Sequence, residues 1–173
     1  MGTNIIGTSG LININYNPLV TKFNELRFFT GITILSGLGG LGNLLEITLP
    51  AAGKLREFAD GALNYSYLPM DMLVIPEGVT TFGNHSIGRS GCHLKAVDFP
   101  STTTTFSGYI LFQVSTLTTV IIRATTPPTI NSNALNVIPS TAIIYVPDES
   151  VDLYKSSWSA VASRIKPLSE YTN

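Results

Sequence analysis

Short stretches that alternate apolar and polar residues recur along this chain at a nearly constant spacing. They follow the pattern L-x-x-I-x-I-P or a close variant, and they occupy residues 44–50, 70–76, 94–100, 117–123 and 141–147. Their second apolar position recurs after 26, 24, 23 and 24 residues. Alternation over so short a run is typical of a β-strand. A Pro at its end cannot donate to a ladder and therefore ends the strand.

A second apolar motif with the same period follows the first four of these stretches. It lies at residues 55–63, 79–87, 103–111 and 127–135, and residues 31–35 resemble a shortened earlier copy. One such unit cannot bury its apolar side alone, whereas stacked units bury a continuous core. The pattern therefore predicts a mostly-β chain, a parallel-β solenoid of about five coils of ~24 residues. We expect the strands of successive coils to pair in parallel, one strand from each coil.

The two ends of such a stack need caps, because the end coils would otherwise expose the core. Residues 148–164 predict a capping helix with a single apolar side. That side carries Val151, Tyr154, Trp158, Val161 and Ile165. Asp148 or Ser150 is suited to cap its start, and Pro167 to stop it. We expect this helix to cover the last coil, with Trp158 packed into the core.

The first residues are expected to form a strand or two that seal the first coil. They contain five large aliphatic residues, Ile5, Ile6, Leu11, Ile12 and Ile14. The predicted organisation is therefore an N-terminal cap segment over residues 1–25, the repeats over residues 26–147, and a capping helix with its tail over residues 148–173.

The best-preserved copy, residues 75–83 followed by Gly-Cys-His-Leu at residues 91–94, resembles the BspA-type leucine-rich repeats. Residues 28–33 resemble the opening segment of such proteins in Bacteroides-like bacteria, and residues 144–158 resemble their closing segment. The fourth copy departs from the pattern, because its strand ends in Arg123 rather than Pro. The resemblance implies a curved leucine-rich-repeat solenoid, secreted or on a cell surface. It also implies a role in adhesion or protein binding and no enzymatic activity.

Composition narrows the classes of partner. Of the 173 residues 44% are hydrophobic, only 12% are charged, and the net charge is −1. With no basic excess, the chain is not expected to bind nucleic acid or an anionic membrane. A single Cys excludes a disulfide framework and a Cys-rich zinc module.

No targeting or membrane-spanning segment is predicted. Residues 99–122 are uncharged and long enough to cross a bilayer, but they contain Pro100 and many Ser and Thr residues, which favours strands and turns. The first cation is Lys22, so no basic region typical of a secretory signal precedes it. We expect that a signal has been removed or that the protein is not exported by that route.

Two motifs could suggest chemistry. Residues 37–42 satisfy G-x-G-x-x-G, but strand-like residues follow where a dinucleotide site needs a helix, so we interpret them as a turn. His85, Cys92 and His93 are the only His and Cys residues. We interpret them as a buried structural Cys with two surface His, because zinc would need a fourth ligand. We predict no cofactor, no metal and no catalytic residues, and hence no enzyme.

The candidate interaction face lies on the outward side of the predicted strands. If Ile47 and Leu49 point inward, alternation places five sizeable apolar residues outward. These are Met72, Val74, Ile121, Ile143 and Tyr145. An exposed apolar row of this kind indicates a partner or self-association surface. Alternatively, a loop, the N-terminal segment or a neighbouring chain covers it, because parallel sheets usually have both faces covered.

The function predicted from the sequence is therefore that of a non-enzymatic repeat protein, secreted or on a cell surface, that binds a protein or glycan ligand. The alternative is a structural component of a larger assembly, such as a phage virion or an appendage. Low charge combined with an apolar face fits either role.

Overall fold

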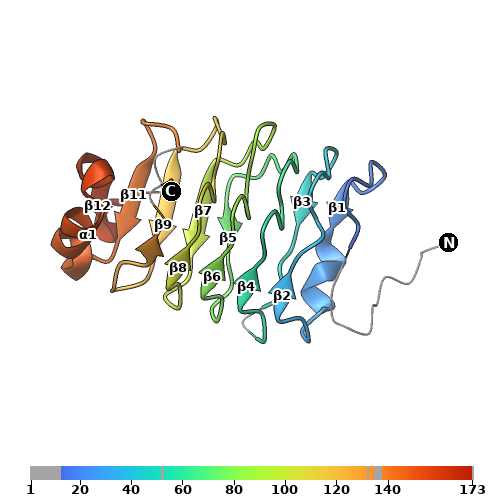
Figure 1. Cartoon of the computed structure of the whole chain (residues 1–173), viewed down its shortest axis with the longest axis horizontal. Helices are drawn as coiled ribbons and strands as arrows, with labels where there is room; N and C mark the ends of the chain where they lie inside the picture. The colour runs from blue at the N-terminus through green and yellow to red at the C-terminus, as the bar shows by residue number, and fades with distance from the viewer. Residues whose placement is uncertain (1–12, 52, 132, 135–137, 173) are drawn as a thin grey trace.

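The computed structural model describes residues 13–51, 53–131, 133–134 and 138–172. It is mostly β, with two five-stranded parallel sheets and a separate two-stranded parallel sheet (Figure 1). The first sheet contains β5 (Leu73–Val74), β7 (Ala96–Phe99), β9 (Thr119–Ile122), β11 (Ile143–Val146) and β12 (Ile165–Pro167). The second sheet contains β2 (Ile34–Leu35), β4 (Glu57–Phe58), β6 (Thr81–Phe82), β8 (Thr105–Phe106) and β10 (Thr129–Ile130). The two-stranded sheet pairs β1 (Lys22–Phe23) with β3 (Glu46–Ile47).

The second motif of the repeats forms a strand of its own, and these strands build the second sheet. Phe58 pairs with Phe82, and Phe82 pairs with Phe106, in parallel ladders. The expectation of one strand per coil is therefore wrong. β-branched residues such as Thr81 and Thr105 precede these Phe residues, and such residues favour extended backbone. The regularly spaced short strands agree with the predicted parallel, solenoid-like repeat.

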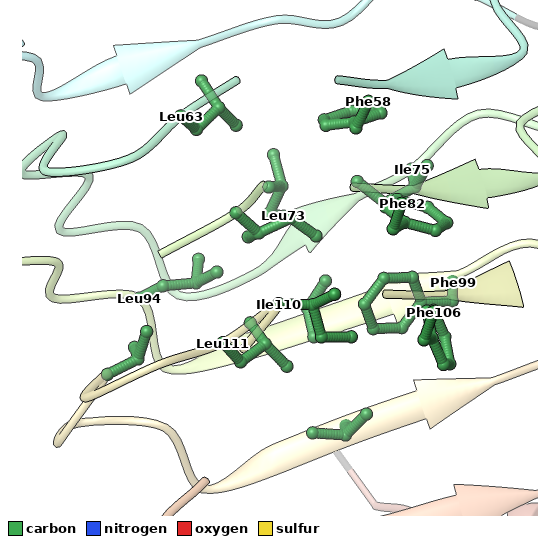
Figure 2. Packing of buried hydrophobic residues seen from close by; sticks show 14 of the residues in the cluster. Phe58, Leu63, Leu73, Ile75, Phe82, Leu94, Phe99, Phe106, Ile110 and Leu111 are labelled. Atoms are coloured by element: carbon green, nitrogen blue, oxygen red, sulfur yellow. The ribbon is translucent and has the colours of Figure 1, made fainter. Parts of the chain in front are cut away.

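A column of aromatic rings runs through the largely aliphatic core between the two sheets. The Phe58 and Phe82 centroids lie 5.3 Å apart, and those of Phe82 and Phe106 lie 5.5 Å apart. Phe99 of the first sheet meets Phe82 edge to face at 4.9 Å (Figure 2). Aromatic pairs contribute about 0.5–1.5 kcal/mol beyond the burial of their area. The column therefore both fills the core and holds the coils in register.

The turns that leave the second sheet are tied together by side chains one repeat apart. The Asp60 carboxylate accepts a hydrogen bond from the backbone N–H of Asn84 at 2.7 Å. The Asn84 side-chain oxygen accepts one from the N–H of Gly108 at 3.0 Å. These bonds satisfy the backbone donors of the exposed Asn84 and the buried Gly108, and they fix the spacing of successive turns.

No ladder joins β3 to β5 in the described part of the chain, so the first-motif strands are split into two sheets. Eleven residue steps separate Ile47 from Phe58, whereas nine separate Leu73 from Phe82. The two additional residues lengthen the corner before β4 and take β3 out of ladder register with β5. The 26-residue step in the sequence pattern marks this place. The expected pairing of all successive strands is wrong here alone.

The glycine-rich residues 37–42 form a turn, as predicted. Gly37 and Gly40 adopt φ values of 73° and 71°, which glycine reaches at little cost. Strand β3 follows, and the described residues 43–51 contain no helix. The context that a dinucleotide-binding turn requires is therefore missing.

The predicted C-terminal helix over residues 148–164 is much shorter than expected. α1 covers only Val151–Ser157, flanked by the 3₁₀ turns η2 (Asp148–Ser150) and η3 (Ser159–Arg164). Trp158 interrupts the helix with φ −117° and ψ 53°. Its ring is 2% exposed and packs against Phe106 and Tyr154, so core packing overrides helical backbone. The expectation that Trp158 packs in the core is confirmed.

The predicted helix caps are also wrong, because both side chains bind elsewhere. The Ser150 hydroxyl donates to the carbonyl of Thr125 at 2.8 Å. The Asp148 carboxylate accepts from the N–H of Ser169 at 3.0 Å. The chain then adds β12 to the first sheet and ends in η4 (Leu168–Glu170), which contacts β11. We call residues 168–172 the C-terminal tail.

At the other end, Ile14 is 8% exposed and belongs to the core, and η1 (Asn24–Phe28) follows β1. The other N-terminal residues expected to seal the first coil, Ile5, Ile6, Leu11 and Ile12, lie outside the described residues. The cap prediction for residues 1–25 is therefore tested only at Ile14.

Candidate functional site

The side of β3 and of the first sheet that faces away from the core is called the outer face here. The predicted alternation of the strands is confirmed. The predicted inward residues Ile47, Leu73, Val97, Val120 and Ile144 all belong to the buried core cluster. Met72, Val74, Ile121, Ile143 and Tyr145 do not belong to that cluster. Their exposure, however, differs sharply along the sheet.

The end of the outer face near β9 and β11 is covered. Ile121, one of the predicted outward residues, is only 1% exposed, so at this position the alternative of a covered face holds. In the neighbouring strands its register partners are Asp98 and Tyr145. The ring of Tyr145 lies 5.2 Å from that of Tyr171 in the C-terminal tail. The tail of the same chain thus lies against Tyr145, and both Tyr145 and Ile143 are half-buried.

A partly buried ion pair lies on this covered end, with the Asp98 side chain 7% and the Arg123 side chain 47% exposed. The Asp98 carboxylate accepts hydrogen bonds from the Arg123 guanidinium, from Nε at 2.8 Å and from Nη2 at 2.7 Å. These bonds raise the pKa of Arg123. Arg123 lies two positions beyond Ile121, on the same face, so its side chain reaches back toward the preceding strand. Sequence reasoning missed the pair, although Arg123 in place of the usual Pro was its signal.

The other end of the outer face is open. Val74 is 58% exposed, and it borders a groove of about 420 Å³ between β3 and β5. Met72, Met70 and Leu49 also line the groove. Elsewhere in the sheet, ladder hydrogen bonds hold neighbouring strands together. β3 and β5 are not paired, and the groove lies between them. The groove therefore combines apolar side chains with two strand edges.

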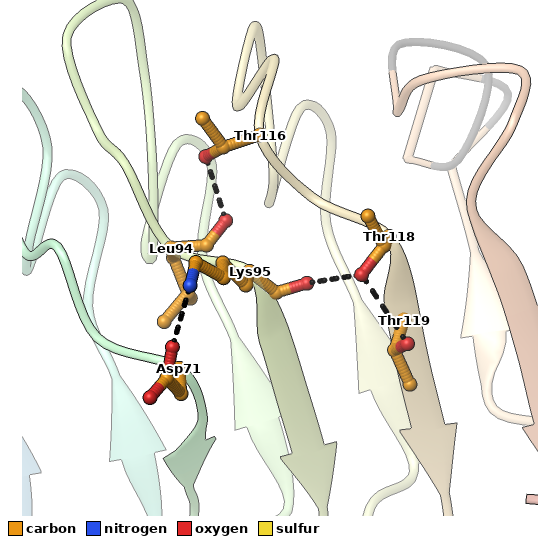
Figure 3. A network of polar contacts seen from close by, with 6 residues as sticks. All are labelled: Asp71, Leu94, Lys95, Thr116, Thr118 and Thr119. Atoms are coloured by element: carbon orange, nitrogen blue, oxygen red, sulfur yellow. Dashed lines mark hydrogen bonds and ion pairs between the residues drawn. The ribbon is translucent and has the colours of Figure 1, made fainter. Parts of the chain in front are cut away.

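A polar corner adjoins the groove and holds the next strands. Lys95 donates to the carboxylate of Asp71 at 2.7 Å, and the Thr116 hydroxyl donates to the carbonyl of Leu94 at 2.9 Å. The hydroxyl of Thr118 donates to the carbonyl of Lys95 (Figure 3). Asp71 and Lys95 are both largely exposed, so the ion pair between them contributes little stability. These hydrogen bonds order the start of β7 and β9. The groove beside the corner is apolar by comparison.

The three residues considered for metal or nucleophile chemistry have separate environments. Cys92 is 2% exposed, as expected for a structural Cys, and burial raises the pKa of its thiol. His93 is exposed and packs against Tyr67, with ring centroids 4.7 Å apart. His85 stacks on Tyr109 at 5.1 Å, and desolvation lowers its pKa. Within the described ranges, no three His, Cys, Asp or Glu side chains cluster as metal ligands would.

Comparison with known proteins adds no relative. No protein-family model matches the chain, and no curated protein matches it. The described residues include no helix that is long and apolar enough to cross a membrane. The outer face is accordingly interpreted on its own geometry.

Proposed function

We propose that this chain is a non-enzymatic binding module of the BspA-like leucine-rich-repeat kind, secreted or displayed on a cell surface, and that its ligand is a protein. The observation that carries the proposal is Val74, 58% exposed beside an apolar groove between two unpaired strand edges. Monomeric proteins seldom leave such an edge without a use or a cover. The repeat architecture and the resemblance to that family support the same class of function.

The chemistry of the groove favours an extended segment of a partner protein. Unpaired backbone N–H and C=O groups on β3 and β5 can form ladder bonds with such a segment. Alternate side chains of the segment would point to the groove, where the thioethers of Met70 and Met72 adapt to different shapes. Two exposed ion pairs lie beside it, Asp71–Lys95 next to β5 and Lys22–Glu46 across β1 and β3. The lining itself is mainly apolar, so we expect apolar shape more than charge to select the partner.

The binding test uses a displayed library of eight-residue peptides, selected against the full chain. We expect the selected peptides to alternate apolar and polar residues. They should bind Val74→Glu at least tenfold more weakly than the original protein. The matched control is Leu153→Glu, because Leu153 is 49% exposed on α1, away from the groove. Equal binding by both variants, or no enrichment of alternating peptides, would refute the groove as the site.

The location test separates the proposal from its alternative. Peptide mass spectrometry on separated surface, secreted, cytosolic and virion fractions of the source culture measures where the native protein resides. Enrichment at the surface or in the medium supports the adhesin-like role. Enrichment in virions would overturn it and favour a structural component whose outer face contacts other subunits.

A further inference from the structure

A different surface, formed by the turns that leave the second sheet, carries an unusual choice of residues. One position in each turn adopts a left-handed backbone at intervals of 24 residues. It is Gly37 (φ 73°), Gly61 (66°), His85 (52°) and Tyr109 (60°). Glycine reaches this conformation freely, whereas a side chain with a Cβ is strained there. Two aromatic residues thus occupy a position that glycine fills at lower cost in the two preceding turns.

The strained backbone places the two rings in a stack. The His85 and Tyr109 rings lie 5.1 Å apart with only 11° between their planes. Phe112 meets both rings edge to face, each at 5.4 Å. The neighbouring Arg89 guanidinium lies over Tyr65, 4.7 Å from its ring centre. Tyr65 is 38% exposed and the other rings are half-buried, so the cluster forms an aromatic surface.

Polar groups that suit hydroxyl ligands surround this surface. Asp60 and Arg89 are the two charges that act on His85, with opposite signs. Two buried polar atoms here, Asn64 Oδ1 and His85 Nδ1, have no hydrogen-bond partner among the described residues. A Cβ at Gly61 would touch only the Asn64 side chain, so no ring continues the stack on that side. Backbone strain retained at orphaned polar atoms is typical of functional sites.

We propose that the cluster of Tyr65, His85, Arg89, Tyr109 and Phe112 is a sugar-binding platform. The C–H face of a pyranose ring packs on the aromatic surface, and the side chains of Asp60 and Arg89 bind its hydroxyl groups. An aromatic surface could also stack a nucleobase. The net charge of −1 and the neighbouring Asp60 disfavour a phosphodiester chain, and Arg89 is the one cation in the cluster. This site is separate from the groove at Val74.

The left-handed backbone makes a sharp test possible. His85→Gly and Tyr109→Gly remove the rings and relieve the strain, so the loss of ring packing is offset and both variants should fold. Gln113→Gly is the matched control, because Gln113 is also left-handed (φ 54°), is exposed and belongs to no ring pair. Circular dichroism and urea unfolding confirm that each variant is folded before binding is measured.

The probes are an array of neutral pyranose oligosaccharides and a ten-residue oligothymidylate. We expect the original chain and Gln113→Gly to bind the same oligosaccharides, and His85→Gly and Tyr109→Gly to bind them at least tenfold more weakly. Val74→Glu should bind them normally, which separates this site from the proposed protein-binding groove. Binding of the oligothymidylate alone, no binding to any oligosaccharide, or binding of the oligosaccharides by His85→Gly and Tyr109→Gly as tightly as by the original chain would overturn the proposal.

Discussion

The two ends of the outer face have similar apolar sequences and opposite environments. At β5, Val74 is 58% exposed beside a groove, whereas at β9 Ile121 is 1% exposed. Strand alternation places both residues on the same side of the sheet, so residue type does not explain the difference. At β9 the neighbours of Ile121 are Asp98 and Tyr145, and Tyr145 in turn contacts Tyr171 of the C-terminal tail. What surrounds each strand, rather than its own apolar pattern, therefore decides which apolar row is a candidate surface.

The largest expected effect is the contrast between Ile121→Glu and Val74→Glu. An unpaired carboxylate at position 121 would be buried, and we expect the free energy of unfolding to fall by about 3–5 kcal/mol. At position 74 the carboxylate would reach water, and the change should stay within about 0.5 kcal/mol. Urea unfolding followed by circular dichroism measures both. Similar losses in the two variants would show that the two ends do not differ as described.

A smaller effect is expected from the ion pair on the covered end. Arg123→Ala leaves the Asp98 carboxylate, 7% exposed, without its hydrogen bonds from the guanidinium. We expect a loss of about 2–3 kcal/mol in the free energy of unfolding. Asp98→Asn leaves the partly exposed Arg123 free to bind water and should cost about 1 kcal/mol. The same urea assay checks the order, and a larger loss in Asp98→Asn than in Arg123→Ala would contradict it.

The smallest effect concerns the attachment of the tail and its dependence on pH. Hydrogen bonds from Ser169 lower the pKa of Asp148 below its usual value of 3.8. Because the folded pKa is depressed, this stabilisation is complete above the unfolded pKa and is lost as pH falls through the folded pKa. The urea midpoint of the original chain should exceed that of Asp148→Asn slightly at pH 7. At pH 2 the two midpoints should converge, and a constant difference would exclude this carboxylate as the cause.

Much of the fold could be predicted because two separate motifs recur along the chain with the same period. The inward positions of the first motif, such as Val97 and Val120, belong to the core as expected. The second strand of each repeat was missed, since a two-residue strand such as Thr81–Phe82 is too short to show alternation. The interruption of the C-terminal helix was missed because apolar periodicity indicates which residues are buried, not whether the backbone is helical at each of them. Trp158 would be buried in a continuous helix as well as in the interrupted one.

The candidate site was only partly predictable, for a different reason. Alternation identifies the side of a strand on which a residue lies but not what covers that side. The strand pattern alone therefore could not show that Ile121 is buried and Val74 exposed. The tail that contacts β11 follows the last repeat and carries no periodic signal. The stack of His85 on Tyr109 had a signal, namely two residues 24 apart at a position where Gly37 and Gly61 precede them. Comparing equivalent turn positions across the copies finds it.

The split between β3 and β5 also has a mechanical consequence. The second sheet is continuous past this point, since β2, β4 and β6 pair in order, while the first-motif strands share no ladder there. Bending that separates two coils elsewhere breaks ladder bonds in both sheets. Between β3 and β5 no ladder bond resists it, although the N–H of Leu68 donates to the carbonyl of Leu44 at 2.8 Å just before these strands. Fewer backbone bonds therefore oppose bending at this place. The groove can therefore widen or narrow about the Phe58–Phe82 pair, and its width can adjust to an occupant without unfolding a coil.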